Sequence, residues 1–268
     1  MANKILLVSG SSGSGKSTLI ETIIVENNMF KLCRSLTTRK KRDTKQDEEH
    51  YMFTSKKVFK DLLSAGELLE YTVYPDEKDG DFYGTPRSEL NRILELEDSI
   101  PILELDVYGA LQLLNKSEYD IKSCFLIPPP MIVAERLLRR NSESLEVIQK
   151  RLQRSIKEVS IACSFYELLL DNTDIEKSKE LLLAYGLGHV GPTSRDTRME
   201  LVAQYVEEME QIVKLCAKIQ HTMGGSYKGK DILLEISKKQ AWKDLHGQTV
   251  VEKYANTDRE KINIKNIL

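Results

Sequence analysis

The sequence contains few cysteines, and their spacing excludes two kinds of site. Four occur in 268 residues, at Cys33, Cys124, Cys163 and Cys216. None of them forms a Cys-x-x-Cys pair or has a histidine next to it. A zinc centre and a disulfide framework are therefore not expected. We predict four ordinary, partly buried thiols.

Long apolar runs and an excess of one charge are also missing. No stretch approaches the roughly 18 uninterrupted apolar residues of a membrane span, and the run Ile5 to Val8 is too short for the core of a signal peptide. The 39 Lys and Arg nearly balance the 41 Asp and Glu. We therefore expect a cytoplasmic protein that binds neither nucleic acid nor membrane. Any anionic ligand needs a local site.

What is present is an alternation of short apolar runs with amphipathic stretches, which predicts an α/β fold with a parallel core sheet. The expected strands are Lys4–Ser9, Pro101–Asp106, Lys122–Ile127 and Glu167–Leu170. The expected helices are Lys16–Val25, Val107–Leu114, Met131–Arg139, Leu145–Cys163 and Ile175–Tyr185.

Two segments interrupt or follow this pattern. A polar, tyrosine-rich segment at Ser35–Arg87 looks like an inserted lobe, with a helix at Lys56–Ala65 and strands near Tyr51 and Leu68–Val73. After a turn-rich linker we predict a helix that begins at Thr197, with Glu200 in a capping box. Its apolar stripe comprises Met199, Val202, Val206, Met209, Val213 and Cys216. We expect this stripe to pack within the monomer rather than on a second copy. A short helix is expected at Ile232–Leu245.

One motif carries chemistry by itself. The segment fits G-x-x-x-x-G-K-[ST] and lies between an apolar strand and an amphipathic helix: Gly10, Ser11, Ser12, Gly13, Ser14, Gly15, Lys16 and Ser17, followed by Thr18. Such a loop directs backbone N–H groups at phosphate oxygens, its lysine reaches the transferring phosphates, and its serine hydroxyl can bind Mg²⁺. The motif predicts that the chain binds a nucleotide.

Further motifs follow in a fixed order. They are Ser35-Leu36-Thr37-Thr38-Arg39 with Arg42, then Tyr51-Met52-Phe53, Gly66-Glu67-Leu68-Leu69-Glu70, Gly80-Asp81-Phe82-Tyr83-Gly84-Thr85, and Leu103-Glu104-Leu105-Asp106. With Glu135-Arg136-Leu137, Arg140, Lys150-Arg151-Leu152 and Asp171-Asn172, the chain resembles guanylate kinases from about Lys4 to Tyr185.

The resemblance implies a P-loop nucleoside monophosphate kinase fold. The guanylate-kinase-like domain would span residues 1–187, with a GMP-binding lobe at about 35–87 and a helical lid at about 136–155. Residues 188–268 would be a helical C-terminal extension of unknown role. The implied reaction is the direct, in-line phosphorylation of GMP, and of dGMP, by ATP with Mg²⁺.

The resemblance also implies a role for individual residues. Arg39, Arg42, Tyr51 and Tyr83 would grip the GMP phosphate, because arginine forks bind it bidentately and tyrosine hydroxyls add neutral donors. Glu70 would accept from guanine, and Ser35, Thr85 and Glu104 would complete the base and ribose contacts. On the ATP side, Lys16 and the lid residues Arg136, Arg140 and Arg151 would stabilise the transferring phosphates. Asn172 would lie near the adenine.

Several alternatives stay open. Asp106 is predicted to organise Mg²⁺ together with Ser17, but it can equally cap the following helix. The segment 74–79 is about four residues longer than is usual in the family, and Tyr108 stands where glutamine is typical. A binding module for a phosphorylated or acidic peptide, or a kinase for another monophosphate acceptor, are the competing functions. The protein is expected to be a monomer or a homodimer, the latter through residues 197–222.

Overall fold

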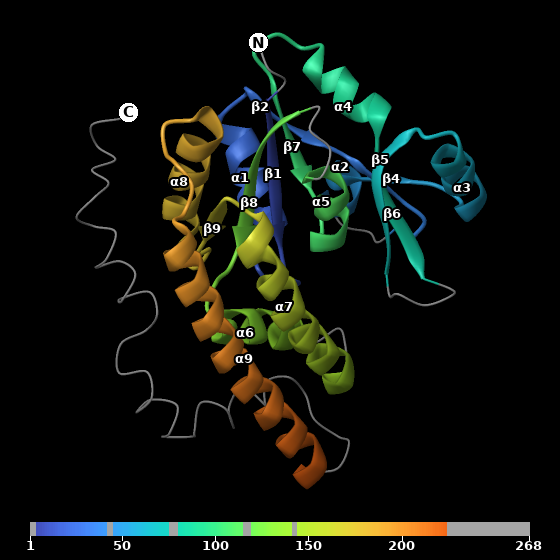
Figure 1. Ribbon diagram of the computed structural model, residues 1–268. Helices are drawn as coiled ribbons and strands as arrows, with labels where there is room; N and C mark the ends of the chain where they lie inside the picture. Colours follow the sequence, from blue (N-terminus) through green and yellow to red (C-terminus); the bar gives the residue numbers. More distant parts are fainter. Residues whose placement is uncertain (1–3, 42–44, 75–79, 115–118, 141–143, 224–268) are drawn as a thin grey trace.

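Figure 1 shows the computed structural model, which describes residues 4–41, 45–74, 80–114, 119–140 and 144–223. The strands are β1 (Lys4–Gly10), β2 (Phe30–Cys33), β3 (Ser35–Thr37), β4 (Tyr51–Phe53), β5 (Leu68–Tyr74), β6 (Asp81–Pro86), β7 (Ile100–Glu104), β8 (Asp120–Leu126) and β9 (Leu168–Leu170). The helices are α1 (Lys16–Glu26), α2 (Lys45–His50), α3 (Lys56–Ser64), α4 (Arg87–Leu94), α5 (Val107–Leu114), α6 (Pro130–Arg140), α7 (Leu145–Phe165), α8 (Ile175–Leu187) and α9 (Arg195–Met223).

The strands of these residues form two sheets. The core sheet has the order β2-β7-β1-β8-β9, and each of its neighbouring pairs is parallel. The second sheet has the order β4-β3-β6-β5 and mixes one parallel pair with two antiparallel pairs. It lies with α3 to one side of the core (Figure 1). The predicted α/β fold with a parallel core sheet is therefore confirmed, and the inserted segment has a sheet of its own.

Strand β1 is apolar along its length because both of its faces are buried. Successive side chains of a strand point to opposite faces of the sheet. Leu6 and Val8 lie in the core cluster that contains residues of α1 and α8, whereas Ile5 and Leu7 lie in the cluster that contains residues of α5, α6, α7 and α9. Helices cover both faces, so neither set of side chains can be polar.

The four predicted core strands correspond to β1, β7, β8 and β9, but one boundary differs in a way that matters for the site. The strand expected to run to Asp106 ends at Glu104. The Asp106 carboxylate then accepts a hydrogen bond from the backbone of Gly109 at 2.8 Å, in the first turn of α5. Strands β2, β3 and β6 and helices α2 and α4 were not predicted.

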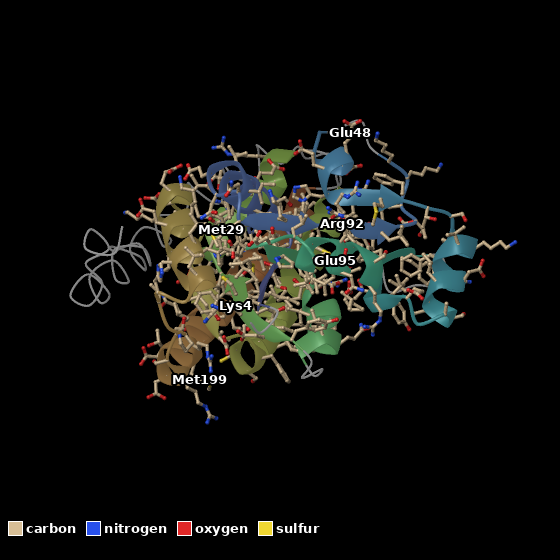
Figure 2. All side chains as sticks on the ribbon, turned by 90° about the horizontal axis from the view of Figure 1, so that it is seen from above. Lys4, Met29, Glu48, Arg92, Glu95 and Met199 are labelled. Carbon is tan, nitrogen blue, oxygen red and sulfur yellow. The ribbon has the colours of Figure 1, made fainter. Side chains whose placement is uncertain are left out.

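Helix α9 begins earlier than predicted, and most of its predicted apolar stripe is buried or partly buried. It starts at Arg195, and its first turn is capped by Ser194, which accepts from the backbone of Thr197 at 3.2 Å, so the predicted capping box at Thr197 is wrong. Met199 is 56% exposed, and Figure 2 shows it at the edge of the molecule. The buried apolar side chains are Val202, Tyr205, Met209, Ile212 and Cys216, and Val206 and Val213 are partly buried. Tyr205 and Ile212 were not predicted.

The apolar face of α9 is covered within the same chain. Its buried side chains belong to one cluster with those of α6 and α7, and Figure 1 shows α9 running alongside α7. A dimer is therefore not needed to bury this face. The expected helix at 232–245 lies outside the described residues.

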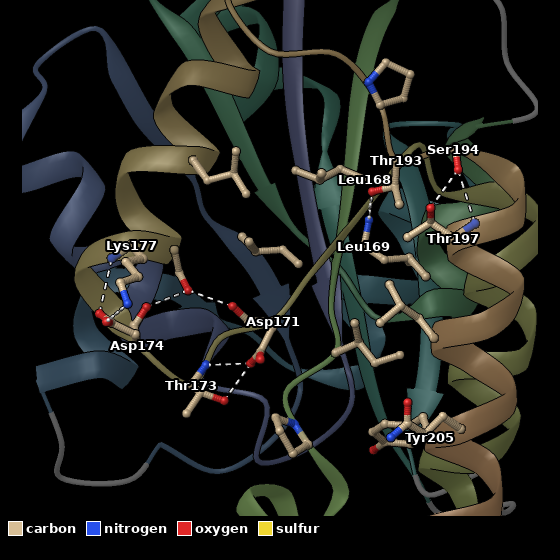
Figure 3. A pocket seen from close by; sticks show the side chains of 18 of the residues that line it. Leu168, Leu169, Asp171, Thr173, Asp174, Lys177, Thr193, Ser194, Thr197 and Tyr205 are labelled. Carbon is tan, nitrogen blue, oxygen red and sulfur yellow. Dashed lines mark hydrogen bonds and ion pairs between the residues drawn. The ribbon is translucent and has the colours of Figure 1, made fainter. Parts of the chain in front are cut away.

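The segment before α9 is attached to the edge of the core sheet. Thr193 donates its backbone N–H to the carbonyl of Glu167 at 2.9 Å, and its hydroxyl accepts from the backbone of Leu169 at 3.1 Å. This attachment leaves a pocket of about 480 Å³ between β9, α8 and α9 (Figure 3). None of the predicted site residues lines it.

Two expectations about composition can be compared with the structure. The four cysteines are buried and free, deeper than the partly buried thiols we predicted. In the described ranges, no helix is long and apolar enough to cross a membrane.

Candidate active site

The glycine-rich motif forms the predicted loop between β1 and α1. Gly15 caps α1 with a left-handed backbone, at φ 89°. A Cβ atom built there would lie 2.6 Å from Asn172 Nδ2, so the position needs glycine for both backbone conformation and space. Lys16 Nζ donates to the carbonyls of Gly10 and Ser11. The Lys16 side chain therefore folds back over the loop. A bound phosphate would compete with these two carbonyls for its ammonium group.

Three distant segments meet on this loop. Asn172 Nδ2 donates to the Ser14 carbonyl at 2.9 Å. Arg136 Nη1 donates to the same carbonyl at 3.0 Å, and its Nη2 donates to the Asn172 carbonyl at 3.0 Å. Asn172 Oδ1 and Ser14 Oγ are buried without a hydrogen-bond partner. Buried polar atoms normally have a partner, which a bound ligand or water would supply here.

Helix α7 also contacts the loop. Arg151 Nη1 of α7 donates to Ser12 Oγ at 2.7 Å. Arg139, which is not a predicted site residue, pairs with Glu135 on the exposed side of α6. Arg140 ends α6, but its side chain lies outside the described residues. The predicted Thr18 is exposed in the first turn of α1.

Beside Ser17 the structure places a different carboxylate from the one expected. Ser17 Oγ donates to Glu104 Oε1 at 2.8 Å, whereas Asp106 caps α5 and lies 3.4 Å from Arg154 Nη2. The other oxygen of Glu104 lies 2.8 Å from His50 Nδ1. Glu104 was predicted to contact GMP and Asp106 to accompany Ser17. The helix-cap alternative for Asp106 is the one that the structure has.

The charge state of Glu104 follows from these neighbours. Burial acts to raise its pKa, but the hydrogen bond from His50, the positive charge of Lys16 and the Ser17 hydroxyl outweigh it, so the pKa lies below its ordinary value. Burial conversely acts to lower the pKa of His50, and the carboxylates of Glu104 and Glu21 raise it overall. Glu104 is therefore an anion at neutral pH, next to the P-loop lysine.

A second basic and aromatic cluster lies in the inserted lobe. The Arg39 guanidinium binds both carboxylate oxygens of Asp47, at 2.9 and 2.7 Å, and lies 5.3 Å from the ring centre of Tyr51. The Tyr51 and Tyr83 rings meet edge-on with centroids 6.2 Å apart. Burial raises the pKa of Tyr83, and the nearby positive charge of Arg39 opposes this rise. The predicted Arg39, Tyr51 and Tyr83 thus come together, whereas Arg42 lies outside the described residues.

A buried carboxylate lies on the adjoining strands of the same lobe. Glu70 Oε1 accepts from Thr85 Oγ1 at 2.7 Å, and both side chains are buried. A Cβ atom on Gly109 would collide with the other oxygen of Glu70, so the glycine of α5 makes room for it. Ser35 opens β3 and pairs with Tyr51 of β4. Glu70 and Thr85 are therefore held as one unit.

Sequence reasoning missed three charged residues of this region. Asp47 and His50 come from α2, where a run of acidic residues gave no sign that one of them would be buried against Arg39. Arg154 was not among the predicted site residues, yet its guanidinium lies 4.7 Å from the ring centre of Tyr74 and 5.4 Å from that of Tyr108. It also pairs with Asp106 and Glu158. Arg154 thus links the lid helix to the inserted lobe.

Comparison with known proteins gives one consistent result. A family model described as guanylate kinase matches residues 2–185. The chain is 36% identical over 195 residues to a guanylate kinase of Mycoplasmoides gallisepticum, covering 69% of this chain and 96% of that protein. It is 34% identical over 185 residues to one of Desulfitobacterium hafniense, covering 67% and 89%.

A solved structure agrees with the sequence relatives. The guanylate kinase of Anaplasma phagocytophilum superimposes with a TM-score of 0.50 at 26% identity, over 69% of this chain and 87% of that one. The predicted fold and family are confirmed by these matches. The chain belongs to the guanylate kinase family and is an ATP:GMP phosphotransferase.

Proposed function

We propose that the P-loop binds ATP, that the inserted lobe binds GMP or dGMP, and that the γ-phosphoryl group passes directly between them. The observation that carries this proposal is the position of Glu104. One of its oxygens accepts from Ser17 of the P-loop, and the other contacts His50, the residue before Tyr51. Glu104 therefore lies between the P-loop and the cluster of Arg39, Tyr51 and Tyr83. Direct transfer requires the donor and acceptor phosphates to be close together, so their two binding clusters must be neighbours.

On the ATP side, backbone N–H groups of residues 10–17 would cradle the phosphates, and Lys16 would exchange its loop carbonyls for phosphate oxygens. Arg136 and Arg151 already lie on the loop. Together with Arg140 they would neutralise charge that spreads over the transferring group. Asn172 Oδ1, which is buried without a hydrogen-bond partner, would accept from an adenine amino group.

The donor set beside Lys16 fits Mg²⁺. This ion takes oxygen ligands, usually one or two from the protein, and keeps water and substrate phosphates for the rest. Ser17 Oγ and the anionic Glu104 provide such a pair, 2.8 Å apart. When bound, the ion would neutralise phosphate charge.

On the GMP side, Arg39, Arg42, Tyr51 and Tyr83 would hold the phosphate. The Arg39 guanidinium would exchange part of its contact with Asp47 for the GMP phosphate, and the hydroxyls of Tyr51 and Tyr83 would donate further hydrogen bonds. No covalent intermediate with the enzyme is needed: the residues align the acceptor oxygen with the γ-phosphorus and exclude water. The cytoplasm stays the predicted location.

The reaction is tested with one assay. ADP formation from ATP by the full chain is measured with GMP, dGMP, AMP, CMP, UMP and a sugar phosphate as acceptors. We expect turnover with GMP and dGMP and little with the others. A non-catalytic binding module would respond to none of them, and a kinase for another acceptor would prefer that acceptor.

Glu70 is expected to select guanine. Its carboxylate can accept from both N1–H and N2–H of the base, and Thr85 fixes one of its oxygens. Glu70→Gln replaces an acceptor by a donor, so the preference for GMP over AMP in kcat/KM should fall roughly 10- to 100-fold, the range of one bidentate base contact. Glu67→Gln, an exposed neighbour, is the control. An unchanged preference in the Glu70 variant would remove it from this role.

A further inference from the structure

Helix α9 lies beyond the part of the chain that the family model matches. The match ends at residue 185, and α9 spans Arg195–Met223. Its buried side chains pack with those of α6 and α7, the two helices that bring Arg136 and Arg151 onto the P-loop. Helix α9 therefore packs along the two helices whose arginines contact the P-loop (Figure 1).

One side chain of α9 makes a hydrogen bond to the helix that carries Arg151. Tyr205 is 3% exposed, and its hydroxyl donates to Ser155 Oγ of α7 at 3.4 Å. The side chain of Ser11 in the P-loop lies near this hydroxyl. Figure 3 shows Tyr205 projecting from α9 at one end of the pocket. Burial raises its pKa to about 12, so it stays a neutral hydroxyl that can donate one bond and accept another.

The hydrogen bond between Tyr205 and Ser155 lies close to the contact that Arg151 makes with the P-loop. Arg151 Nη1 donates to Ser12 Oγ at 2.7 Å. Ser155 lies four residues after Arg151, on the same face of α7 one turn later. The Tyr205 hydroxyl therefore contacts α7 one turn away from the arginine that contacts the loop.

Neighbouring contacts limit how far this part of α7 can move. The Ser155 hydroxyl donates to the Leu152 carbonyl at 2.6 Å, which leaves its oxygen free to accept from Tyr205. On the next turn of α7 toward its start, Gln149 Nε2 donates to the Val213 carbonyl of α9 at 3.5 Å. The half of α7 that carries Arg151 is thus held to α9 on both sides of that arginine.

We propose that Tyr205 is a positioning residue for phosphoryl transfer: through Ser155 its hydroxyl holds α7 against α9 and so places Arg151 on the ATP phosphates. The proposal rests on the role given above to Arg151. It assigns a purpose to the extension helix that local sequence does not reveal. In this proposal Tyr205 has a role beyond packing, whereas the buried side chains of Met209 and Ile212 serve packing alone.

The test removes only the hydroxyl. In Tyr205→Phe, the apparent KM for ATP and the Kd for ATP measured by calorimetry without GMP should both rise about 3- to 10-fold, the value of one net hydrogen bond. The KM for GMP should not change. Tyr185→Phe is the matched control, because it removes another buried tyrosine hydroxyl, bonded to Glu167 and remote from the loop. It should lower Tm while leaving both KM values unchanged.

Two further variants separate positioning from packing. Ser155→Ala should raise the KM for ATP in the same way, and the Tyr205→Phe and Ser155→Ala double variant should be no worse than the more affected single one. In an Arg151→Met background, Tyr205→Phe should have no additional effect on ATP binding. A Tyr205→Phe enzyme that loses Tm but keeps the wild-type KM and Kd for ATP would overturn the proposal.

These readouts also distinguish failure of the proposal from failure of the proposed function. If the wild-type chain forms no ADP with GMP, the acceptor assignment is wrong, and the Kd for ATP still reports on Tyr205. If Arg151→Met leaves ATP binding and turnover unchanged, the role of Arg151 is wrong, and the positioning proposal falls with it.

Discussion

Lys16→Ala is expected to lower kcat for the phosphorylation of GMP by at least about 100-fold, the usual cost of removing one preorganised group that stabilises transition-state charge. In the structure, Lys16 Nζ lies between the loop carbonyls of Gly10 and Ser11 and contributes to the low pKa of Glu104. Alanine leaves the transferring phosphates without this cation. Binding of GMP, whose cluster lies in the other lobe, should stay measurable by calorimetry.

The control for Lys16 is an exposed lysine. Lys214 is 77% exposed at its side chain and pairs with Glu210 one turn earlier on α9, so Lys214→Ala should retain wild-type kcat and nearly wild-type Tm. Comparing Tm of the two variants excludes unfolding as the cause of lost turnover. Wild-type-like turnover in Lys16→Ala would contradict the assignment of Lys16 to the transferring phosphates.

Arg39→Met is expected to weaken both GMP binding and folding. The loss of a bidentate, charge-assisted contact with the phosphate should raise the KM for GMP by about 100-fold. The substitution also leaves the carboxylate of Asp47, 6% exposed, without its guanidinium partner. Breaking a buried pair from one side costs roughly 3–5 kcal/mol in the free energy of unfolding.

A second substitution separates these two effects. In the Arg39→Met, Asp47→Asn double variant the buried charge is gone, so urea denaturation should recover most of the lost stability, whereas the KM for GMP should stay raised. Arg139→Met is the control, because Arg139 is 71% exposed and pairs only with Glu135 across one turn of α6. A double variant that regains both stability and GMP affinity would show that Arg39 serves the fold and not the substrate.

The carboxylates of β7 show where prediction from sequence ends. Glu104 and Asp106 are two residues apart, and in a continuing strand both would face the same side of the sheet. The strand ends at Glu104, so Asp106 lies just before α5 and caps its first turn. The residue at which a strand stops depends on its neighbours in the sheet. The sequence therefore identified both carboxylates but could not decide which one faces Ser17.

Helix α9 gives the same lesson for packing. The spacing of three and four residues predicted an amphipathic helix, and the structure has one. Which residues are buried depends on the orientation of the helix against α7, and this leaves Met199 exposed and buries Tyr205 and Ile212. A rotation of this kind has no local signal, because periodicity defines a face only to within a neighbouring row of side chains.

By itself the sequence determined the P-loop, the parallel core sheet and the order of motifs that identifies the family, because each of these is written in short, contiguous stretches. The tertiary structure decided which groups meet: Glu104 with Ser17 and His50, Arg39 with Asp47, and Tyr205 with Ser155. Each of these contacts joins side chains from separate elements. Their short distances depend on how sheets and helices pack, and a one-dimensional pattern does not contain that information.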